Sequence, residues 1–309
     1  MPYNDTMTIA IVGASGFLGS HLTSYLLDTT SYDIKAISKH PTPVSPAAGQ
    51  VDRLMNLAGD IFDEDQLTEE LIGVDVAYYF VHMMGQANKD FYTQEAIAAN
   101  RFSAAVIAAK VKRVIYMGGL GNDHEQLSEH LLSRHNTGTL LRENCPLVLE
   151  FRASMIIGNG SVAFDIIKNL VQKLPVMALP RWSKTLTQPI ALADALEYLR
   201  LAAEVDLPYT RIIEIGGPTP MTYKALYKAY ANWCGKHPLV IRLPYVPEWL
   251  GGWVLDTFTS PFHAKIGRIM VHSMSNAMVV THDHAQQAFP SVHPKSLVAS
   301  FDDLQTESR

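Results

Sequence analysis

The stretch "MTIAIVGASGFLGSHLTSYLLD", residues 7–28, decides the fold. Residues 7–13 are an apolar run of the kind that forms a buried strand, and after them the leucines recur at helical spacing. Gly13, Gly16 and Gly19 lie at this junction in the pattern G-x-x-G-x-x-G. Such glycines let a strand turn tightly into a helix and let a diphosphate approach the backbone and the helix N-terminus. The stretch therefore predicts a dinucleotide-binding loop at the start of a βαβ unit.

The rest of the first half repeats this alternation of strands and helices. Further strands are expected at 32–38, 52–60, 73–82, 111–119 and 145–158, and a long alanine-rich helix at 90–110. Alternation of this kind requires parallel strands joined by right-handed crossovers. We therefore predict the α/β class and a Rossmann fold, a doubly wound parallel sheet with helices on both faces.

The second half of the chain has a less regular pattern. We predict an NAD(P)-binding Rossmann domain over residues 1–157 and a smaller C-terminal substrate-binding region over 158–309, partly interleaved with the Rossmann sheet. The tail from 236 to 309 contains several prolines, which end or interrupt regular structure. We expect this tail to be rich in loops.

Composition excludes several classes of protein. The 309 residues are 48% hydrophobic and 18% charged, which is enough apolar material for a large core. A net charge of −5 leaves no broad basic face, so nucleic acid is not expected as a partner. Two cysteines, Cys145 and Cys234, cannot form a disulfide framework and fit a cytoplasmic protein. No apolar run approaches the ~18 residues of a membrane-spanning helix, so no membrane association is expected, and the apolar segment 249–258 is interpreted as a core or lid element.

The end of the second expected strand bears on which dinucleotide binds. An NAD-binding site usually offers a carboxylate about 20 residues past the glycines, where it holds the ribose hydroxyls. Here Ser38 and Lys39 occupy that region, and no acidic residue occurs between Ile34 and Asp52. A hydroxyl and an ammonium group attract a 2′-phosphate, whereas a carboxylate repels it. We predict NADP(H) as the preferred cofactor and NAD(H) as the alternative; in the competing interpretation Lys39 is only a solvated loop residue.

Several motifs resemble those of one enzyme family. They are "VGASGFLG" (12–19), "VKRVIYMGG" (111–119), "FRASMIIGNG" (151–160), "TQPIALADALEYL" (187–199) and "IIEIGGP" (212–218). Together they resemble the extended short-chain dehydrogenase/reductases. "YMGGLG" and "LPVMALPRW" further resemble the atypical, NmrA-like branch, whose members are usually labelled nucleoside-diphosphate-sugar epimerase-like. The resemblance covers nearly the whole chain and implies an NAD(P)-binding fold.

The resemblance also implies which residues contact the cofactor. The diphosphate is expected against Gly13, Ser15, Gly16, Phe17 and Leu18, the 2′-phosphate against Ser38 and Lys39, the adenine against Asp60 and Ile61, and the nicotinamide ribose against Phe80, Val81 and His82. Asn100, on the long helix, occupies a position that often supports an active-site water or the backbone. In the other interpretation it is an ordinary polar residue on an exposed face.

The catalytic dyad of that family is missing. The family's chemistry needs a Ser or Thr after the fifth strand and Tyr-x-x-x-Lys on the next helix. The lysine lowers the pKa of the tyrosine, so that the phenol exchanges a proton with the substrate oxygen as hydride moves. Here Gly118 and Gly119 occupy the Ser/Thr position, and no tyrosine in the sequence is followed four residues later by lysine.

The helix that should carry the dyad, "EHLLSRHNTGTLLRE" (129–143), aligns in two registers. One register puts His130 and Arg134 at the Tyr and Lys positions. The other uses Leu131 and His135, and it fits better because related chains carry a glycine shortly after the lysine. In that register His135 is predicted to hold the ribose and His82 to act as the proton donor, which its ordinary pKa of about 6.5 allows. With 12 histidines in the chain, chance placement near a pocket is the competing explanation.

Other polar residues are further candidates for a site. Arg152, and Arg181 with Trp182, are candidates for the substrate cleft, although a surface arginine beside a packing tryptophan explains the second pair equally well. His282 and His284 have the spacing of metal ligands on a strand, but no third and fourth ligand matches them. We predict no metal site.

Two functions of different classes fit these observations. The first is an NADP(H)-dependent oxidoreductase that acts on a small carbonyl or hydroxyl compound of unknown identity with an unusual proton donor. The second is a non-catalytic NADP(H) sensor of NmrA-like type that acts through a protein partner. The missing dyad favours the sensor, and the long C-terminal region favours a substrate. A protein partner and a homodimer both stay open.

Overall fold

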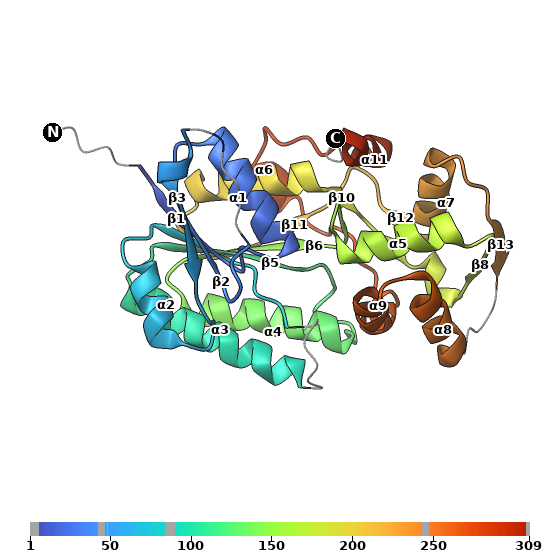
Figure 1. The fold of residues 1–309 in the computed structure, drawn as a ribbon, viewed down its shortest axis with the longest axis horizontal. Coiled ribbons are helices and arrows are strands. Elements are labelled where there is room, and N and C mark those ends of the chain that lie inside the picture. The colour runs from blue at the N-terminus through green and yellow to red at the C-terminus, as the bar shows by residue number, and fades with distance from the viewer. Residues whose placement is uncertain (1–5, 43–46, 48, 84–89, 243–246, 307–309) are drawn as a thin grey trace.

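A parallel sheet of seven strands forms the centre of the molecule (Figure 1). The computed structural model describes residues 6–42, 47, 49–83, 90–242 and 247–306. The strands of the sheet are β1 (Thr8–Val12), β2 (Asp33–Ser38), β3 (Leu54–Ala58), β4 (Val76–Tyr79), β5 (Arg113–Gly119), β6 (Val148–Ala153) and β11 (Arg211–Ile215). Their order is β3-β2-β1-β4-β5-β6-β11, and every neighbouring pair is parallel.

The strand order reverses between β1 and β4, which is the place where doubly wound sheets bind their ligands. Val12, the last residue of β1, pairs with Ile37 of β2 on one side and with Tyr79 of β4 on the other. The carboxyl ends of these three strands therefore lie level at one edge of the sheet.

Helices cover both faces of the sheet (Figure 1). One face is covered by α1 (Phe17–Thr29) and α6 (Leu192–Glu204), and the other by α2 (Glu64–Leu71), α3 (Phe91–Ala108) and α4 (Glu129–Asn144). Each face has its own apolar core: Leu22 and Leu199 belong to the first, and Phe102 and Leu141 to the second. The predicted doubly wound Rossmann fold is confirmed.

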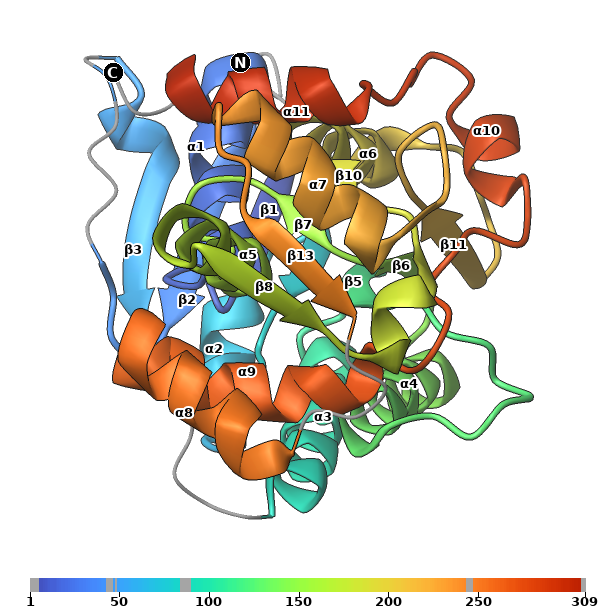
Figure 2. The same cartoon turned by 90° about the vertical axis from the view of Figure 1, so that its right-hand side faces the viewer.

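The remaining elements gather mainly at one end of the sheet, where β8 and β13 form a small parallel pair above α8 and α9 (Figure 2). The helices are α5 (Val162–Lys173), α7 (Tyr223–Trp233), α8 (Glu248–Phe258), α9 (Pro261–Ser273), α10 (His284–Ala288) and α11 (Leu297–Thr306). The strands are β7 (Ile156–Ile157), β8 (Val176–Leu179), β9 (Leu186–Thr187), β10 (Ile190–Ala191), β12 (Met221–Thr222) and β13 (Leu239–Arg242). Short 3-10 helices span Val51–Arg53 and Arg181–Lys184.

The expectation of a loop-rich tail after residue 236 is wrong. The tail contains β13 and the helices α8, α9, α10 and α11. Two of its prolines begin helices instead of breaking them: Pro247 precedes α8, and Pro261 is the first residue of α9, after the capping residue Ser260. A proline is tolerated at these positions because the first N–H groups of a helix have no intrahelical partner.

Two further features concern the second half of the chain. Strand β11 returns from this half to the central sheet and pairs with β6, while the domain boundary at residue 157 stays a prediction.

On α8, Trp249 and Trp253 are exposed by 73% and 56%, so this face of the apolar segment is not part of the core. Among the helices of the described ranges, none is both long and apolar enough to cross a membrane.

Candidate functional site

The glycine loop has the geometry that its sequence predicts. Gly13 has φ +95°, and a Cβ there would lie 2.9 Å from the carbonyl carbon of Phe80. A Cβ on Gly19 would lie 2.4 Å from the carbonyl oxygen of Gly13, so helix α1 contacts the turn directly. Gly16 is the N-cap of α1 and makes no side-chain cap, and it is exposed together with Ser15. The first N–H groups of α1 are therefore open to an anion.

Phe17 and Leu18 continue this loop as half-buried residues of the first turn of α1. The ring of Phe17 lies against the segment after β7, because a Cβ on Gly158 would be 3.2 Å from Phe17 Cζ. Its centroid is 5.1 Å from that of His21. The glycine loop is thus connected through one aromatic ring to the start of the C-terminal region.

At the end of β2, Lys39 forms an ion pair with Asp60, with Nζ 2.8 Å from Oδ2. Asp60 also accepts a hydrogen bond from the backbone N–H of Phe62, and its pKa is lowered, chiefly by the hydrogen bond from Lys39. Ser38 and Ile61 are buried beside this pair. The residues predicted to contact the 2′-phosphate and the adenine therefore lie close together. The sequence did not predict that one of them, Asp60, would pair with Lys39.

At the end of β4, His82 is held by a buried carboxylate. Its Nδ1 donates to Oε1 of Glu95 on α3, which also accepts from the backbone N–H of Met83 at 3.0 Å. The hydroxyl of Ser133 on α4 donates to the other oxygen, Oε2. Burial alone would raise the pKa of Glu95, but the hydrogen bond from His82 and the nearby positive charges lower it to about 2.

The contact with Glu95 determines the protonation of His82. A carboxylate accepts hydrogen bonds only, so Nδ1 of His82 carries the proton and Nε2 is left as an acceptor. Burial and the charge of Arg134 lower the pKa of His82, so the ring is neutral at pH 7. Nε2 is covered and makes no hydrogen bond within the described residues. His82 thus offers a lone pair, not the proton that we expected of it.

His130 on α4 faces His82, with 5.4 Å between the ring centroids. Its Nδ1 lies 3.2 Å from Oγ of Ser273 on α9, and burial, together with the charges of His82 and Arg134, lowers its pKa to about 3. Arg134, one turn further along α4, packs over the ring of Tyr116 and donates to the carbonyl of Met117.

The residues of the two registers of α4 lie in different surroundings. Leu131 is 1% exposed and belongs to the core of the C-terminal region. His130 and Arg134 instead lie against the ends of β4 and β5. The structure therefore favours the first register over the one that sequence comparison preferred.

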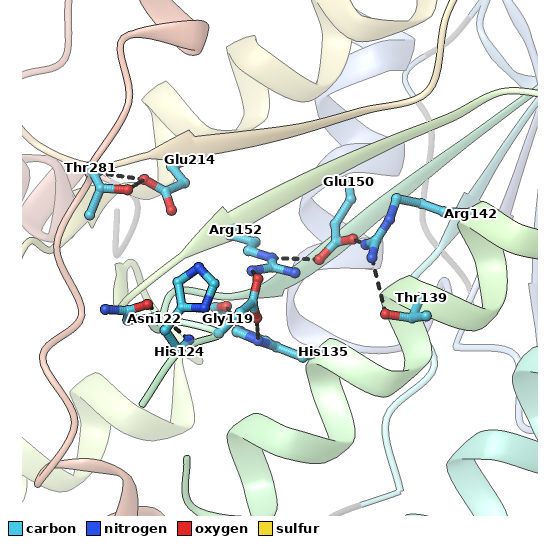
Figure 3. Close-up of polar contacts among 11 residues, drawn as sticks. Gly119, Asn122, His124, His135, Thr139, Arg142, Glu150, Arg152, Glu214 and Thr281 are labelled. Carbon is cyan, nitrogen blue, oxygen red and sulfur yellow. Dashed lines mark hydrogen bonds and ion pairs between the residues drawn. The ribbon is translucent and has the colours of Figure 1, made fainter. Parts of the chain in front are cut away.

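His135 belongs to a separate group of charged side chains (Figure 3). Its Nδ1 lies against Asp123, and its Nε2 lies 2.9 Å from the carbonyl oxygen of Gly119. Arg152 donates through one NH to Asp123 at 2.9 Å and through Nε to Glu150 at 2.6 Å. Both ring nitrogens of His135 are therefore occupied within the protein, so its predicted contact with the ribose is not supported by this arrangement.

The same group continues into α4 through a buried ion pair. Glu150 is fully buried on β6 and lies between Arg152 and Arg142, and Arg142 also donates to the hydroxyl of Thr139 at 3.0 Å (Figure 3). Arg152 is 3% exposed, so its guanidinium is buried among its own partners and does not face an open cleft.

The other candidate residues lie apart from these clusters. Asn100 is exposed on α3 and, five residues beyond Glu95, points to another side of that helix. Arg181 is exposed, while Trp182 packs at 6.0 Å from the ring of Tyr223. Across the described part of the chain, no three metal-binding side chains converge.

The sequence prediction did not identify Glu95, Ser133 or Ser273. Glu95 had a signal: it lies on the same side of α3 as Ala98, Ala99 and Phe102, and an acid within such an apolar stripe requires a partner. Ser273 had none, because it lies in a segment that was expected to be loop.

Comparison with known proteins agrees with the glycine loop. Residues 13–144 match a family model described as NAD(P)H-binding. One curated relative, the N-acetyl-gamma-glutamyl-phosphate reductase of Leifsonia xyli, is 34% identical over 73 residues, which are 24% of this chain and 21% of that protein. The match thus spans about a fifth of that relative's length.

Solved structures share the fold over almost the whole chain. A nucleoside-diphosphate-sugar epimerase from Staphylococcus aureus superposes with a TM-score of 0.74 at 14% identity, covering 96% of this chain and 99% of that one. The NADPH-dependent quinone oxidoreductase of Escherichia coli gives 0.72 at 19%, with coverages of 96% and 99%. The triphenylmethane reductase of Citrobacter sp. gives 0.71 at 16%, with 96% and 100%. These likenesses show a shared fold, and the family model adds an NAD(P)H-binding region over residues 13–144.

Proposed function

From an NAD(P)H-binding chain of this fold, we propose an NADP(H)-dependent oxidoreductase that reduces a small conjugated carbonyl compound, or oxidises the corresponding hydroxyl compound. The observation that carries the proposal is the contact between two histidine rings next to the glycine loop. His82 lies at the end of β4, and His130 lies at the start of α4. Val81, which precedes His82, has its backbone nitrogen only 3.1 Å from where a Cβ of Gly13 would be. A reactive nicotinamide and two imidazoles would therefore share one edge of the sheet.

The cofactor assignment is supported by the loop geometry and by what surrounds it. The open N-terminus of α1 suits a diphosphate, and the end of β4 suits the nicotinamide ribose. When bound, the reduced cofactor supplies a hydride, and the protein's contribution is to orient that cofactor and to manage one proton.

The preference for NADP(H) rests on Lys39. Its ammonium group is paired with Asp60 here, and a 2′-phosphate would offer it a second, doubly charged partner. Asp60 would oppose the phosphate at the same time. We infer a preference that is present but modest, set by the competition between these two charges.

The substrate class follows from the missing tyrosine. A saturated ketone becomes an alkoxide on accepting hydride and needs a strong proton donor, whereas a quinone becomes a phenolate, whose conjugate acid has a pKa near 10. The phenolate is the weaker base, so it requires a less strong proton donor than the alkoxide does. Two of the structural neighbours are named for reductions of conjugated acceptors, a quinone and a triphenylmethane compound, which agrees with this choice.

A second candidate, an NADP(H) sensor that acts through a protein partner, is favoured by one observation. Trp249, Trp253 and Phe262 are exposed by 73%, 56% and 51% on α8 and α9, and exposed aromatic residues are typical of protein interfaces. The same surface would serve a homodimer equally well.

One experiment separates the two functions. Fluorescence titration with NADPH and NADH measures binding, and consumption of NADPH over a panel of quinones, aldehydes and ketones measures turnover. Binding with turnover on quinones supports the oxidoreductase. Binding without turnover on any compound leaves the sensor, and absence of binding contradicts both. His237→Gln, at an exposed position in the loop between α7 and β13, is the matched control for substitutions at His82.

A further inference from the structure

A line of hydroxyl groups runs from the surface to His130. Oγ of Ser128, the N-cap of α4, lies 2.7 Å from Oγ of Ser273, and Ser273 lies 3.2 Å from Nδ1 of His130. Ser273 is 3% exposed, whereas Ser128 is half-buried. The line is held in place by Asn276, which accepts from the backbone N–H of Ser128 at 3.1 Å and donates to the carbonyl of Gln126 at 2.8 Å.

The direction of these hydrogen bonds decides the tautomer of His130. Ser128 accepts from the backbone N–H of Leu131. In one direction Ser128 donates to Ser273 and Ser273 donates to Nδ1 of His130, which then carries its own proton on Nε2. In the other direction Nδ1 of His130 donates to Ser273, and the half-buried Ser128 donates to solvent.

In the first direction the two histidines have opposite roles at the site. Nε2 of His82 is an acceptor because Glu95 takes the proton of Nδ1, and Nε2 of His130 is a donor because Ser273 donates to Nδ1. Within the described residues, Nε2 of His82 has no hydrogen-bond partner. The site would then offer the N–H of His130 beside the place proposed for the nicotinamide.

We propose that the hydroxyl line donates toward His130, that His130 is the catalytic proton donor to the substrate oxygen, and that Ser273 and Ser128 replace its proton from solvent. The proposal rests on the oxidoreductase function given above. When bound, the reduced cofactor would supply a hydride to the substrate carbon. At the substrate oxygen the Nε2–H bond of His130 breaks and an O–H bond forms. The proton of Ser273 moves to Nδ1 of His130, the proton of Ser128 moves to Ser273, and a solvent proton replaces the last one. His130 then carries its proton on Nδ1, and exchange with water restores Nε2–H before the next reduction. In oxidation the same path runs in reverse.

This path explains why the lowered pKa of His130 does not prevent proton transfer. A neutral imidazole cannot give up Nε2–H by itself without becoming an anion. It can do so when Nδ1 receives a proton at the same time, and a hydroxyl line attached to Nδ1 provides that proton. Ser273 is a positioning residue in this scheme, because it acts through His130 and does not touch the substrate.

The first test is the tautomer of His130. Long-range 1H–15N spectra of uniformly 15N-labelled protein distinguish a protonated ring nitrogen from an unprotonated one, and His130→Gln identifies the signals by their loss. In the wild type, between about pH 6 and pH 8, we expect Nε2 to be protonated and Nδ1 to be unprotonated. A proton on Nδ1 would reverse the line and overturn the proposal without any need for a substrate.

The second test uses turnover of a quinone with NADPH. His130→Gln should lower kcat by about 100-fold or more with unchanged NADPH affinity, because general acid catalysis contributes factors of that size. Ser273→Ala should lower kcat by about tenfold, the equivalent of one good hydrogen bond. Ser275→Ala, an exposed serine two residues further on, is the matched control and should leave kcat unchanged.

A third measurement excludes a merely structural effect of Ser273. In mixtures of H2O and D2O, several protons moving together give a curved dependence of kcat on deuterium content, and we expect this curve to become linear in Ser273→Ala. Wild-type turnover that His130→Gln leaves intact would overturn the proton path and leave the oxidoreductase standing. A wild-type protein that binds NADPH but reduces none of the compounds would overturn the oxidoreductase itself, and the path with it.

Discussion

Gly138 on α4 faces the carboxylate of Glu150 on β6 so closely that a Cβ on Gly138 would lie 2.4 Å from Oε2. A side chain there would displace a buried carboxylate that holds two arginines. We expect Gly138→Ala to lower the free energy of unfolding by about 1–3 kcal/mol, the usual effect of overpacking. Urea denaturation measures it. Gly251→Ala, in α8 with open space around it, is the control and should be neutral or slightly stabilising.

Removing the charge of Glu150 should have a larger effect than removing a surface charge. Glu150 is fully buried between Arg142 and Arg152, so Glu150→Gln leaves two guanidinium groups without their shared counterion. We expect a loss of about 3–5 kcal/mol. Asp256→Asn breaks an ion pair with Arg268 whose partners are about half exposed, and it should cost less than about 1 kcal/mol. Equal losses in the two variants would contradict the assignment of Glu150 as a buried counterion.

The histidine pair should make the fold sensitive to mild acid. The pKa of His130 falls from 6.5 to about 3 on folding, with His82, Arg134, Glu95 and Ser273 facing it. As pH falls below 6.5 the unfolded chain binds a proton that the folded chain does not, so stability decreases. Between pH 7 and 5 the loss from His130 is about 2 kcal/mol, and His82 adds a loss of the same sign. His130→Gln should remove the part of this loss that comes from His130. Urea unfolding at pH 7 and pH 5 measures it, and Glu95 stays ionised at both pH values.

Cofactor selectivity should depend on both members of the Lys39–Asp60 pair. Lys39→Ala should weaken NADPH binding about tenfold, because it removes a charge-assisted contact with the 2′-phosphate, and should change NADH binding little. Asp60→Asn should strengthen NADPH binding and weaken NADH binding, because it frees Lys39 and removes a carboxylate from the ribose. Fluorescence titration gives all four dissociation constants. If Lys39→Ala weakens the binding of both cofactors equally, Lys39 does not contact the 2′-phosphate.

Cofactor binding as a whole should depend on Gly13. An alanine there would have to adopt φ +95° and place its Cβ 2.9 Å from the backbone of Phe80. We expect Gly13→Ala to abolish detectable binding of NADPH and NADH by displacing the turn from β4. Gly73→Ala also has positive φ but open space around it, so it controls for backbone strain alone. Retained binding in Gly13→Ala would contradict the role of this loop.

The parts of the fold that sequence predicted are those that short stretches determine. The strand, turn and helix of the glycine loop all lie within residues 7–28, where apolar spacing and three glycines are sufficient evidence. The same holds for β4 and β5, whose apolar runs are uninterrupted. The tail was mispredicted because Pro247 and Pro261 were interpreted as helix breakers, and only their position relative to a cap, such as Ser260, shows that they start helices.

The site was harder to predict because its contacts join distant segments. His82 and His130 are separated by 48 residues, and Ser273 lies 143 residues beyond His130. No local pattern marks such pairs, and the sequence favoured the register of α4 that uses Leu131 and His135. The burial of Leu131 distinguishes them, and burial depends on the packing of α4 against the C-terminal region.

Strand β11 has a consequence for how this chain can be divided. It pairs with β6 over five residues, from Arg211 against Leu149 to Ile215 against Ala153, and so forms one of the two edge strands of the central sheet. A fragment that stops near residue 157 would leave backbone N–H and C=O groups along one edge of β6 unpaired. Such an edge recruits strands from other molecules. The first half of the chain, although it contains the whole glycine loop, is therefore prone to self-association when it is produced without the second.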